Sequence, residues 1–213
     1  MREVLPGVWH WTAVHPKIHI EVSSYWLDSS GVLIDPLVPR EEGLDWFAAR
    51  ECAPSAVLLS NRHHYRESGL FAERFGCAVH CNSSGLHEFS DGRAVVGFDI
   101  GDSLPGGARA FAVDAICPDD TALYLPAARA VVFADGVVSG GPHGNERLLG
   151  FVPDFLMDDP PETKRGLLQA CERVLAELDF DHLLLAHGGP VIGDGRERLS
   201  ELVAVGGRTA FEM

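Results

Sequence analysis

The sequence predicts an α/β fold in which two β-sheets pack face to face and helices cover their outer sides. Strand-like apolar runs cluster in two groups along the chain, and each group is followed by amphipathic helices. No change in composition and no Gly/Ser-rich linker separates the two groups. We therefore expect one domain over residues 1–213, which is long enough to bury a substantial core.

The first group begins as a β-meander. Its strands are expected at 4–14, 19–28, 32–36, 56–60 and 77–81. A helical pattern at 41–51, between two of these strands, indicates a crossover connection. A second amphipathic helix at about 70–75 should end at Gly76, because glycine adopts a left-handed cap without a steric penalty.

The second group repeats this pattern. Its strands are expected at about 94–100, 108–116, 121–125, 130–138 and 182–188. A long helix should run from about Glu162 to Leu178, with Pro160 and Pro161 as its start signal. A last helix near 196–205 completes the chain.

The charge of the chain narrows the classes of partner. With 17 Lys and Arg against 31 Asp and Glu, the formal charge is -14, which disfavours nucleic acid and anionic membranes. The five cysteines are an odd number without zinc-ribbon spacing, and no apolar run has the length of a signal peptide or a membrane span. These features predict a soluble cytoplasmic protein with reduced thiols.

Polar residues follow three of the predicted strands, in the segments 58–69, 131–136 and 183–189. Strand ends are where α/β folds place their sites. Each segment alone has an ordinary structural interpretation, because a histidine after a strand is commonly a loop residue and an aspartate before glycine commonly forms a turn. What indicates a function is the order in which the three segments follow one another along the chain.

In this order the segments resemble the metallo-β-lactamase superfamily, from about Val4 to Val205. The resemblance rests on VLIDP at 32–36, on NRHHYRESG at 61–69 in place of the family's H-x-H-x-D-H motif, on VVFADG at 131–136, and on the strand-end Ala186-His187-Gly188. It implies a four-layer αββα sandwich of two mixed sheets. It also implies a hydrolytic site for two metal ions along one edge, where loops from both halves meet.

Most of the family's ligand positions are changed in this chain. Asn61 stands at the first histidine, Tyr65 at the metal-binding aspartate and Arg66 at the third histidine. The histidine of the middle segment falls near Ile116. Three of the seven expected ligands remain, and these are His63, Asp135 and His187.

Arg66 is the main obstacle to a two-metal site. A guanidinium stays protonated and has no lone pair for a metal. At about 4 Å from a divalent ion and an effective dielectric near 20, it would raise the energy by roughly 8 kcal/mol before other charges compensate. We therefore expect Arg66 to pair with Asp135 in the place of a metal.

Two functions follow. The first is a non-catalytic pocket that needs no cofactor and binds a small molecule, for example an anion. Its candidate lining residues are Asn61, His63, His64, Tyr65, Arg66, Asp135 and His187. The second is a hydrolase for an ester, thioester or amide, with one zinc or other divalent ion on His63, Asp135 and His187. Further donors for such a rearranged site are His64, Cys117, Asp119, Asp120 and His143.

The predicted N-terminal hairpin allows a third, structural role, in which it forms a homodimer contact. It carries Trp9, His10, Trp11, His15 and His19, and it resembles in position a loop that overhangs the site in the superfamily. Aromatic side chains in a first hairpin belong more often to the core or to a homodimer contact than to a substrate platform, and we favour that interpretation.

Overall fold

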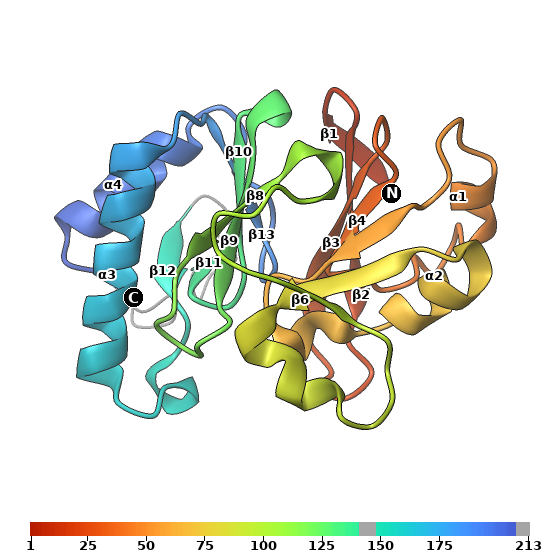
Figure 1. Ribbon diagram of the computed structural model, residues 1–213. Coiled ribbons are helices and arrows are strands. Elements are labelled where there is room, and N and C mark those ends of the chain that lie inside the picture. The colour runs from red at the N-terminus through yellow and green to blue at the C-terminus, as the bar shows by residue number, and fades with distance from the viewer. Residues whose placement is uncertain (141–147, 208–213) are drawn as a thin grey trace.

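The computed structural model of the protein describes residues 1–140 and 148–207. Figure 1 shows two β-sheets next to each other, with helices on the outer side of each. The helices are α1 (Asp45–Ala48) and α2 (Ser68–Phe75) on one side, and α3 (Pro160–Glu177) and α4 (Gly195–Ala204) on the other. This confirms the predicted αββα sandwich. None of the described helices is long and apolar enough to cross a membrane.

The first sheet has seven strands, which lie in the order in which they occur in the chain. They are β1 (Arg2–Leu5), β2 (Val8–Val14), β3 (Glu21–Leu27), β4 (Val32–Ile34), β5 (Ala56–Leu58), β6 (Ala78–Asn82) and β7 (Val96–Phe98). β1 to β4 pair antiparallel, which is the predicted meander, and β4 to β7 pair parallel. Parallel neighbours need crossover connections, and α1 and α2 lie in two of them.

The second sheet has four strands in the order β13-β10-β9-β8. Their bounds are β8 (Arg109–Ala112), β9 (Thr121–Leu125), β10 (Ala130–Phe133) and β13 (His182–Leu185). β10 pairs parallel with β13, and the other pairs are antiparallel. The strand predicted at 130–138 is divided, because its end forms a separate two-stranded sheet of β11 (Val137–Ser139) and β12 (Leu149–Phe151).

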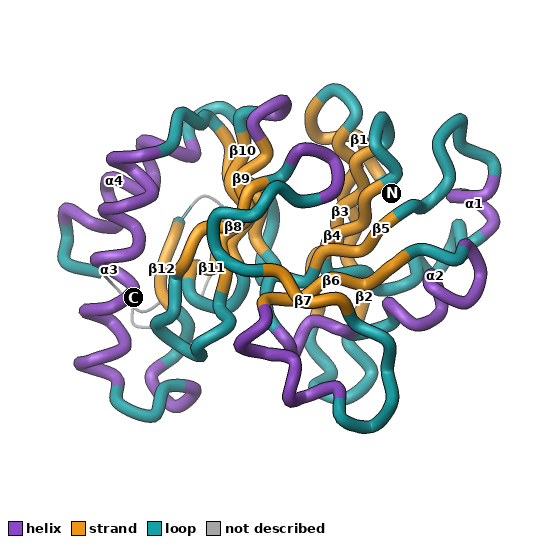
Figure 2. The backbone as a smooth tube through the Cα atoms, viewed as in Figure 1, coloured by secondary structure: helices purple, strands orange, loops and turns teal. Residues whose placement is uncertain are grey.

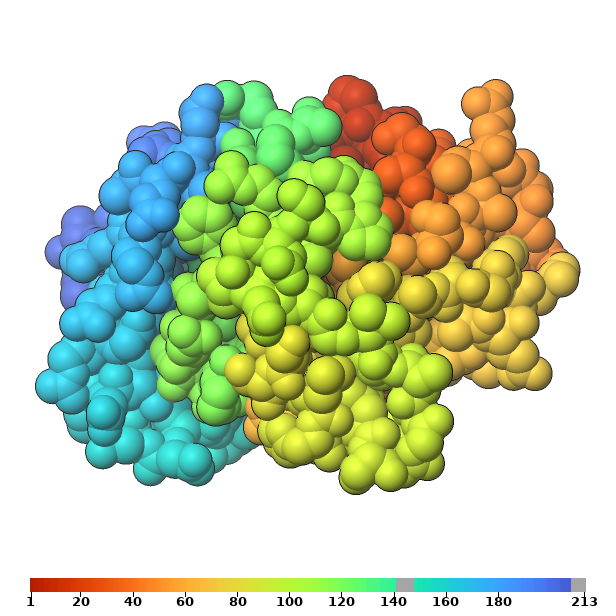
Figure 3. Space-filling model, viewed as in Figure 1, coloured from red at the N-terminus to blue at the C-terminus, as the bar shows by residue number. Residues whose placement is uncertain are grey.

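Short 3-10 helices occupy several of the connections, as the tube in Figure 2 shows. They are η1 (Arg62–Tyr65), η2 (Ser83–Phe89), η3 (Pro105–Gly107), η4 (Pro126–Ala128) and η5 (Asp154–Leu156). The chain passes from the first sheet to the second between β7 and β8. Figure 3 shows this yellow-green segment on the surface where the two halves meet.

Helix α1 is much shorter than the pattern at 41–51 predicts. Gly43 adopts a φ of 62°, outside the helical region, so the helix cannot begin earlier. The single turn nevertheless buries Phe47 completely. Four aromatic rings surround Phe47 at centroid distances of 5.1 to 5.7 Å, and these belong to Trp11, Trp26, Trp46 and Phe71.

Three apolar layers fill the spaces between the sheets and helices. Residues of both sheets, including Ile34 and Val132, form the central layer. Phe133 and Leu167 belong to the layer between the second sheet and α3. Leu33 belongs to the layer beneath α1 and α2, so the adjacent Leu33 and Ile34 point to opposite faces of β4.

Polar side chains of β3 connect the two sheets directly. The hydroxyl of Tyr25 donates to the carbonyl of Leu185 and accepts from its N–H, at 2.8 Å in both cases. Ser23 donates to the carbonyl of Gly188 at 2.6 Å. These bonds tie β3 to the end of β13, where the candidate site begins.

Candidate functional site

The parallel register of β10 and β13 brings Asp135 and His187 together. Phe133 lies opposite Leu185 in this pairing, and two residues further along each strand come Asp135 and His187. Nε2 of His187 lies 2.8 Å from Oδ1 of Asp135. Gly188 follows with a φ of 88°, and a side chain does not fit there, because a Cβ would lie 2.2 Å from the carbonyl oxygen of Ser139. The predicted strand-end residues therefore meet at one sheet edge.

The segment after β5 adds a third side chain, and it is His64 rather than His63. The side chain of Asn61 caps η1 by accepting from the N–H of His63 at 2.9 Å. In the 3-10 turn that follows, His63 is exposed and His64 is buried. Nε2 of His64 lies 3.1 Å from Oδ1 of Asp135. The structure therefore brings His64, and not the predicted His63, together with Asp135 and His187.

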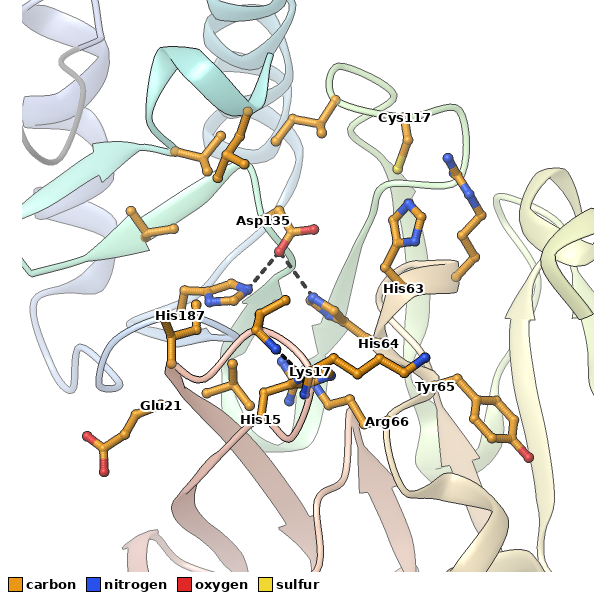
Figure 4. A pocket seen from close by; sticks show the side chains of 18 of the residues that line it. His15, Lys17, Glu21, His63, His64, Tyr65, Arg66, Cys117, Asp135 and His187 are labelled. Carbon is orange, nitrogen blue, oxygen red and sulfur yellow. Dashed lines mark hydrogen bonds and ion pairs between the residues drawn. The ribbon is translucent and has the colours of Figure 1, made fainter. Parts of the chain in front are cut away.

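His64, Asp135 and His187 form a cluster whose ligand atoms all lie within 4.8 Å of one another. Figure 4 shows Asp135 between the two imidazole rings, with a dashed line to each. Asn61 donates from Nδ2 to Oδ2 of Asp135 at 2.7 Å, so Oδ1 is turned toward both histidines. Among the described residues, no other group of three or more His, Cys, Asp or Glu side chains meets the same criterion.

Asp35 supports His64 from the side opposite Asp135. Nδ1 of His64 lies 3.0 Å from Oδ2 of Asp35, and the N–H of Ser60 donates to Oδ1 of Asp35 at 2.9 Å. Burial alone would lower the pKa of His64, but the carboxylates of Asp135 and Asp35 raise it to about 9. Burial alone would raise the pKa of Asp35 and Asp135, and the neighbouring His64 holds both below the usual value.

Asp35 was not among the predicted site residues. A sequence signal was nevertheless present, since Asp35 follows the apolar run at 32–34 much as Asp135 follows the apolar run at 130–134. Asp35 and Arg66 also have positive φ values of 47° and 44°. Such conformations cost a non-glycine residue on the order of 1–3 kcal/mol and cluster at functional sites.

Arg66 does not form the predicted ion pair with Asp135. Its Nη1 donates instead to the carbonyl oxygens of Ser23 and Asp35, at 2.6 Å each. Its Nε and Nη2 are buried and have no hydrogen-bond partner in the described part of the chain. The prediction is wrong in its partner because Asn61 and the two histidines already contact both carboxylate oxygens of Asp135.

Three other candidate donors, Asp119, Asp120 and Cys117, lie outside the cluster. Asp119 binds the backbone N–H and the guanidinium of Arg62. Asp120 is buried, and neither carboxylate oxygen has a partner within the residues described. Cys117 lines the neighbouring cavity, and burial raises the pKa of its thiol. His143 lies outside the described residues.

This donor set does not fit two metal ions. Asn61 turns its N–H group, not its oxygen, toward Asp135, and Arg66 has no lone pair to offer. Tyr65 packs its ring against Phe89, at a centroid distance of 5.6 Å. One ion fits better. The ligand atoms of His64, Asp135 and His187 lie within 4.8 Å of one another, so these three side chains could hold a single ion.

A cavity of about 960 Å³ opens beside the cluster. His63, Tyr65 and Arg66 line it together with the three cluster residues, so these predicted pocket residues share one cavity. Its wall also includes His15 and Lys17 of the loop between β2 and β3. Ile116, at the family's middle histidine position, contributes an apolar side chain.

The aromatic residues of the N-terminal hairpin belong mainly to the core, as we favoured. Trp11 is buried, and Trp9 packs against Trp46 at a centroid distance of 5.1 Å. His10 is buried beneath the site, with Nε2 2.9 Å from the hydroxyl of Ser23. His15 alone of the named hairpin residues lines the cavity, whereas His19 is exposed.

Sequence comparison identifies no family. No family model matches the chain. A curated protein with a local match is the indole-3-pyruvate monooxygenase YUCCA6 of Arabidopsis thaliana, which is 35% identical over 81 residues. The match covers 38% of this chain and 18% of the plant protein, so this chain spans less than a fifth of that protein's length.

Solved structures give a consistent result over nearly the whole chain. A metallo-β-lactamase family protein from Thermus thermophilus has a TM-score of 0.67 at 19% identity, over 95% of this chain and 80% of that one. TTHA1623 in a di-iron-bound form scores 0.64 at 20% identity, over 89% and 98%. The flavodiiron protein from Giardia intestinalis scores 0.66 at 18% identity, over 96% and 58%. The fold of this chain is that of the metallo-β-lactamase superfamily.

Proposed function

We propose that this protein is a hydrolase that uses one divalent metal ion, held by His64, Asp135 and His187. The observation that carries the proposal is the convergence of three ligand atoms within 4.8 Å beside a cavity of about 960 Å³. Two imidazoles and one carboxylate leave coordination positions open, as catalytic sites require. A di-iron-bound protein among the structural neighbours supports metal binding by this fold.

The surrounding residues are arranged to present these ligands. The carboxylate of Asp35 accepts from Nδ1 of His64, which leaves the Nε2 lone pair available once the Nε2 proton is displaced. Asn61 fixes the orientation of the Asp135 carboxylate through Oδ2. A divalent ion in such a site makes water a stronger nucleophile and polarises a carbonyl group.

The reaction class we propose is hydrolysis of a carboxylic ester, thioester or amide. The oxygen of water bonds to the acyl carbon, the bond to the leaving group breaks, and the leaving group takes up a proton. The side chain of Lys17 lines the cavity, and Arg66 supplies a fixed positive charge beside it. Both favour the negative charge that develops on the acyl oxygens.

Metal analysis of protein purified without chelator tests the proposal. We expect about one zinc, iron or manganese ion per chain in the wild type and in the His63→Ala variant, and strong loss in His64→Ala and His187→Ala. His63 is the matched control, because it is adjacent in sequence, exposed and outside the cluster. No metal after metal-replete expression, or a loss in His63→Ala with retention in His64→Ala, would overturn the proposal.

A second function, a metal-free pocket for a small anion, is favoured by the charge balance of the site. The carboxylates of Asp35 and Asp135 contact His64, whose pKa of about 9 makes it cationic at neutral pH. Together with the guanidinium of Arg66, these four groups sum to zero charge without an ion. In this case no variant binds metal, no ester is hydrolysed, and small anions still bind to the wild type.

A further inference from the structure

The cavity beside the cluster has apolar walls that the proposed chemistry leaves unexplained. Among the described residues, ten large apolar side chains are exposed, and four of them line this one cavity. They are Ile18, Ile20, Phe155 and Leu156, with exposed fractions of 54%, 48%, 84% and 56%. Single exposed apolar residues are ordinary, but a group around one cavity marks a binding surface.

These four side chains come from two distant segments. Ile18 and Ile20 lie in the loop between β2 and β3, and Phe155 and Leu156 lie in η5, before α3. The buried or half-buried Val22, Ile116 and Val152 line the same cavity. The apolar wall therefore combines exposed and buried side chains, and it lines the same cavity as the proposed metal ligands.

The polar part of the cavity lies beside this wall. His15 and Lys17 share the loop of Ile18 and Ile20, and Figure 4 shows both near Arg66 and the cluster. Lys17 and Arg66 match a carboxylate or an acyl carbonyl in charge. An occupant that suits both parts has one polar acyl group and one hydrocarbon chain.

We propose that the substrate carries an apolar acyl chain, which binds between the loop residues Ile18 and Ile20 and the η5 residues Phe155 and Leu156. This inference rests on the proposed hydrolase function for the identity of the substrate, whereas binding of the chain itself depends only on the cavity. The acyl carbonyl then lies toward His64, Asp135 and His187, and the released product is a long-chain carboxylate.

Binding of straight-chain carboxylates tests the inference without relying on turnover. Isothermal titration calorimetry with butanoate, octanoate and dodecanoate, kept below micelle-forming concentrations, should give affinities that rise with chain length. Full burial of a methylene strengthens binding about fourfold, so about twofold per methylene is expected in a cavity open to solvent. Equal affinity for all three carboxylates would overturn the inference.

Variants distinguish the contribution of the apolar wall to binding from that of the polar part of the cavity. The double variant Phe155→Ser and Leu156→Ser should weaken dodecanoate binding about tenfold and leave butanoate unchanged, because both residues are exposed and their loss leaves the core intact. Lys17→Gln should weaken all three carboxylates by a similar factor. Ile100→Ser is the control, since Ile100 is 46% exposed and lies outside the cavity. A double variant with wild-type chain-length dependence contradicts the inference.

The two proposals fail in different ways. Chain-length dependence without bound metal or hydrolysis refutes the hydrolase and leaves the apolar wall as a ligand site. If instead the protein binds metal and hydrolyses short acetyl and long acyl esters with equal efficiency, the hydrolase proposal stands and the acyl-chain inference is refuted.

Discussion

His10 makes the stability of this protein depend on pH by an amount that the structure allows us to calculate. The side chain is 6% exposed, and its Nε2 donates to the hydroxyl of Ser23, which in turn donates to the carbonyl of Gly188. Burial lowers the pKa of His10 from 6.5 to about 4, with smaller contributions from the positive charges of Arg2 and the N-terminus. In the unfolded chain these influences are absent.

The sign of the effect follows from the two pKa values. Between about pH 6.5 and 4 the unfolded chain binds a proton that the folded protein excludes, so stability falls as pH falls. The loss begins near pH 6.5 and is complete below about pH 4, where it reaches about 3 kcal/mol. At about pH 4.5 the loss is about 2.5 kcal/mol.

Urea unfolding of the wild type and of His10→Gln from about pH 7.5 to about pH 4.5 measures this contribution. Glutamine keeps an N–H donor for Ser23 but does not titrate. The free energy of unfolding of the wild type should therefore fall by about 2.5 kcal/mol more than that of the variant. His19→Gln, which changes an exposed histidine, should follow the wild type. Parallel pH profiles for the wild type and His10→Gln would refute the reasoning.

Three further changes test other parts of the structure. Burial raises the pKa of Asp120, whose carboxylate has no hydrogen-bond partner within the described residues. The stability of the wild type relative to Asp120→Asn should therefore fall as pH rises from about 4, which Tm measurements at acidic and alkaline pH would show. Equal Tm differences at both pH values would contradict this. Asp35→Asn should weaken metal binding about 10- to 100-fold in competition with a coloured chelator, because it removes the carboxylate behind His64, and an unchanged affinity would exclude that role. Phe47→Ala should lower the free energy of unfolding by about 3–5 kcal/mol in denaturant titrations, since the ring is fully buried, and a loss below about 1 kcal/mol would mean that the aromatic layer repacks.

The fold was predictable because strands buried between its layers are apolar on both faces, and this pattern is visible in the sequence. Leu33 and Ile34 are apolar on both faces of β4, as a strand buried on both sides requires. The end of α2 followed from Gly76, whose φ of 71° matches the expected cap. Helix α1 was overestimated because the apolar spacing at 41–51 does not show that Gly43 leaves the helical region.

The site was only partly predictable for a similar reason. Asp135 and His187 could be found because each follows a strand, and parallel register places strand ends together. The choice between His63 and His64 depends on a single 3-10 turn, and adjacent residues in such a turn point in different directions. The partner of Arg66 could not be predicted from residue types, because it depends on which side chains already contact Asp135, and these are Asn61, His64 and His187.

The proposed ligand set is divided between the two halves of the sandwich, since His64 follows a strand of the first sheet while Asp135 and His187 follow strands of the second. A partly folded intermediate with both sheets formed but not yet docked therefore has normal secondary structure and no site. A metal ion or ligand present during refolding binds only molecules that have completed docking, and by mass action it draws the population toward them.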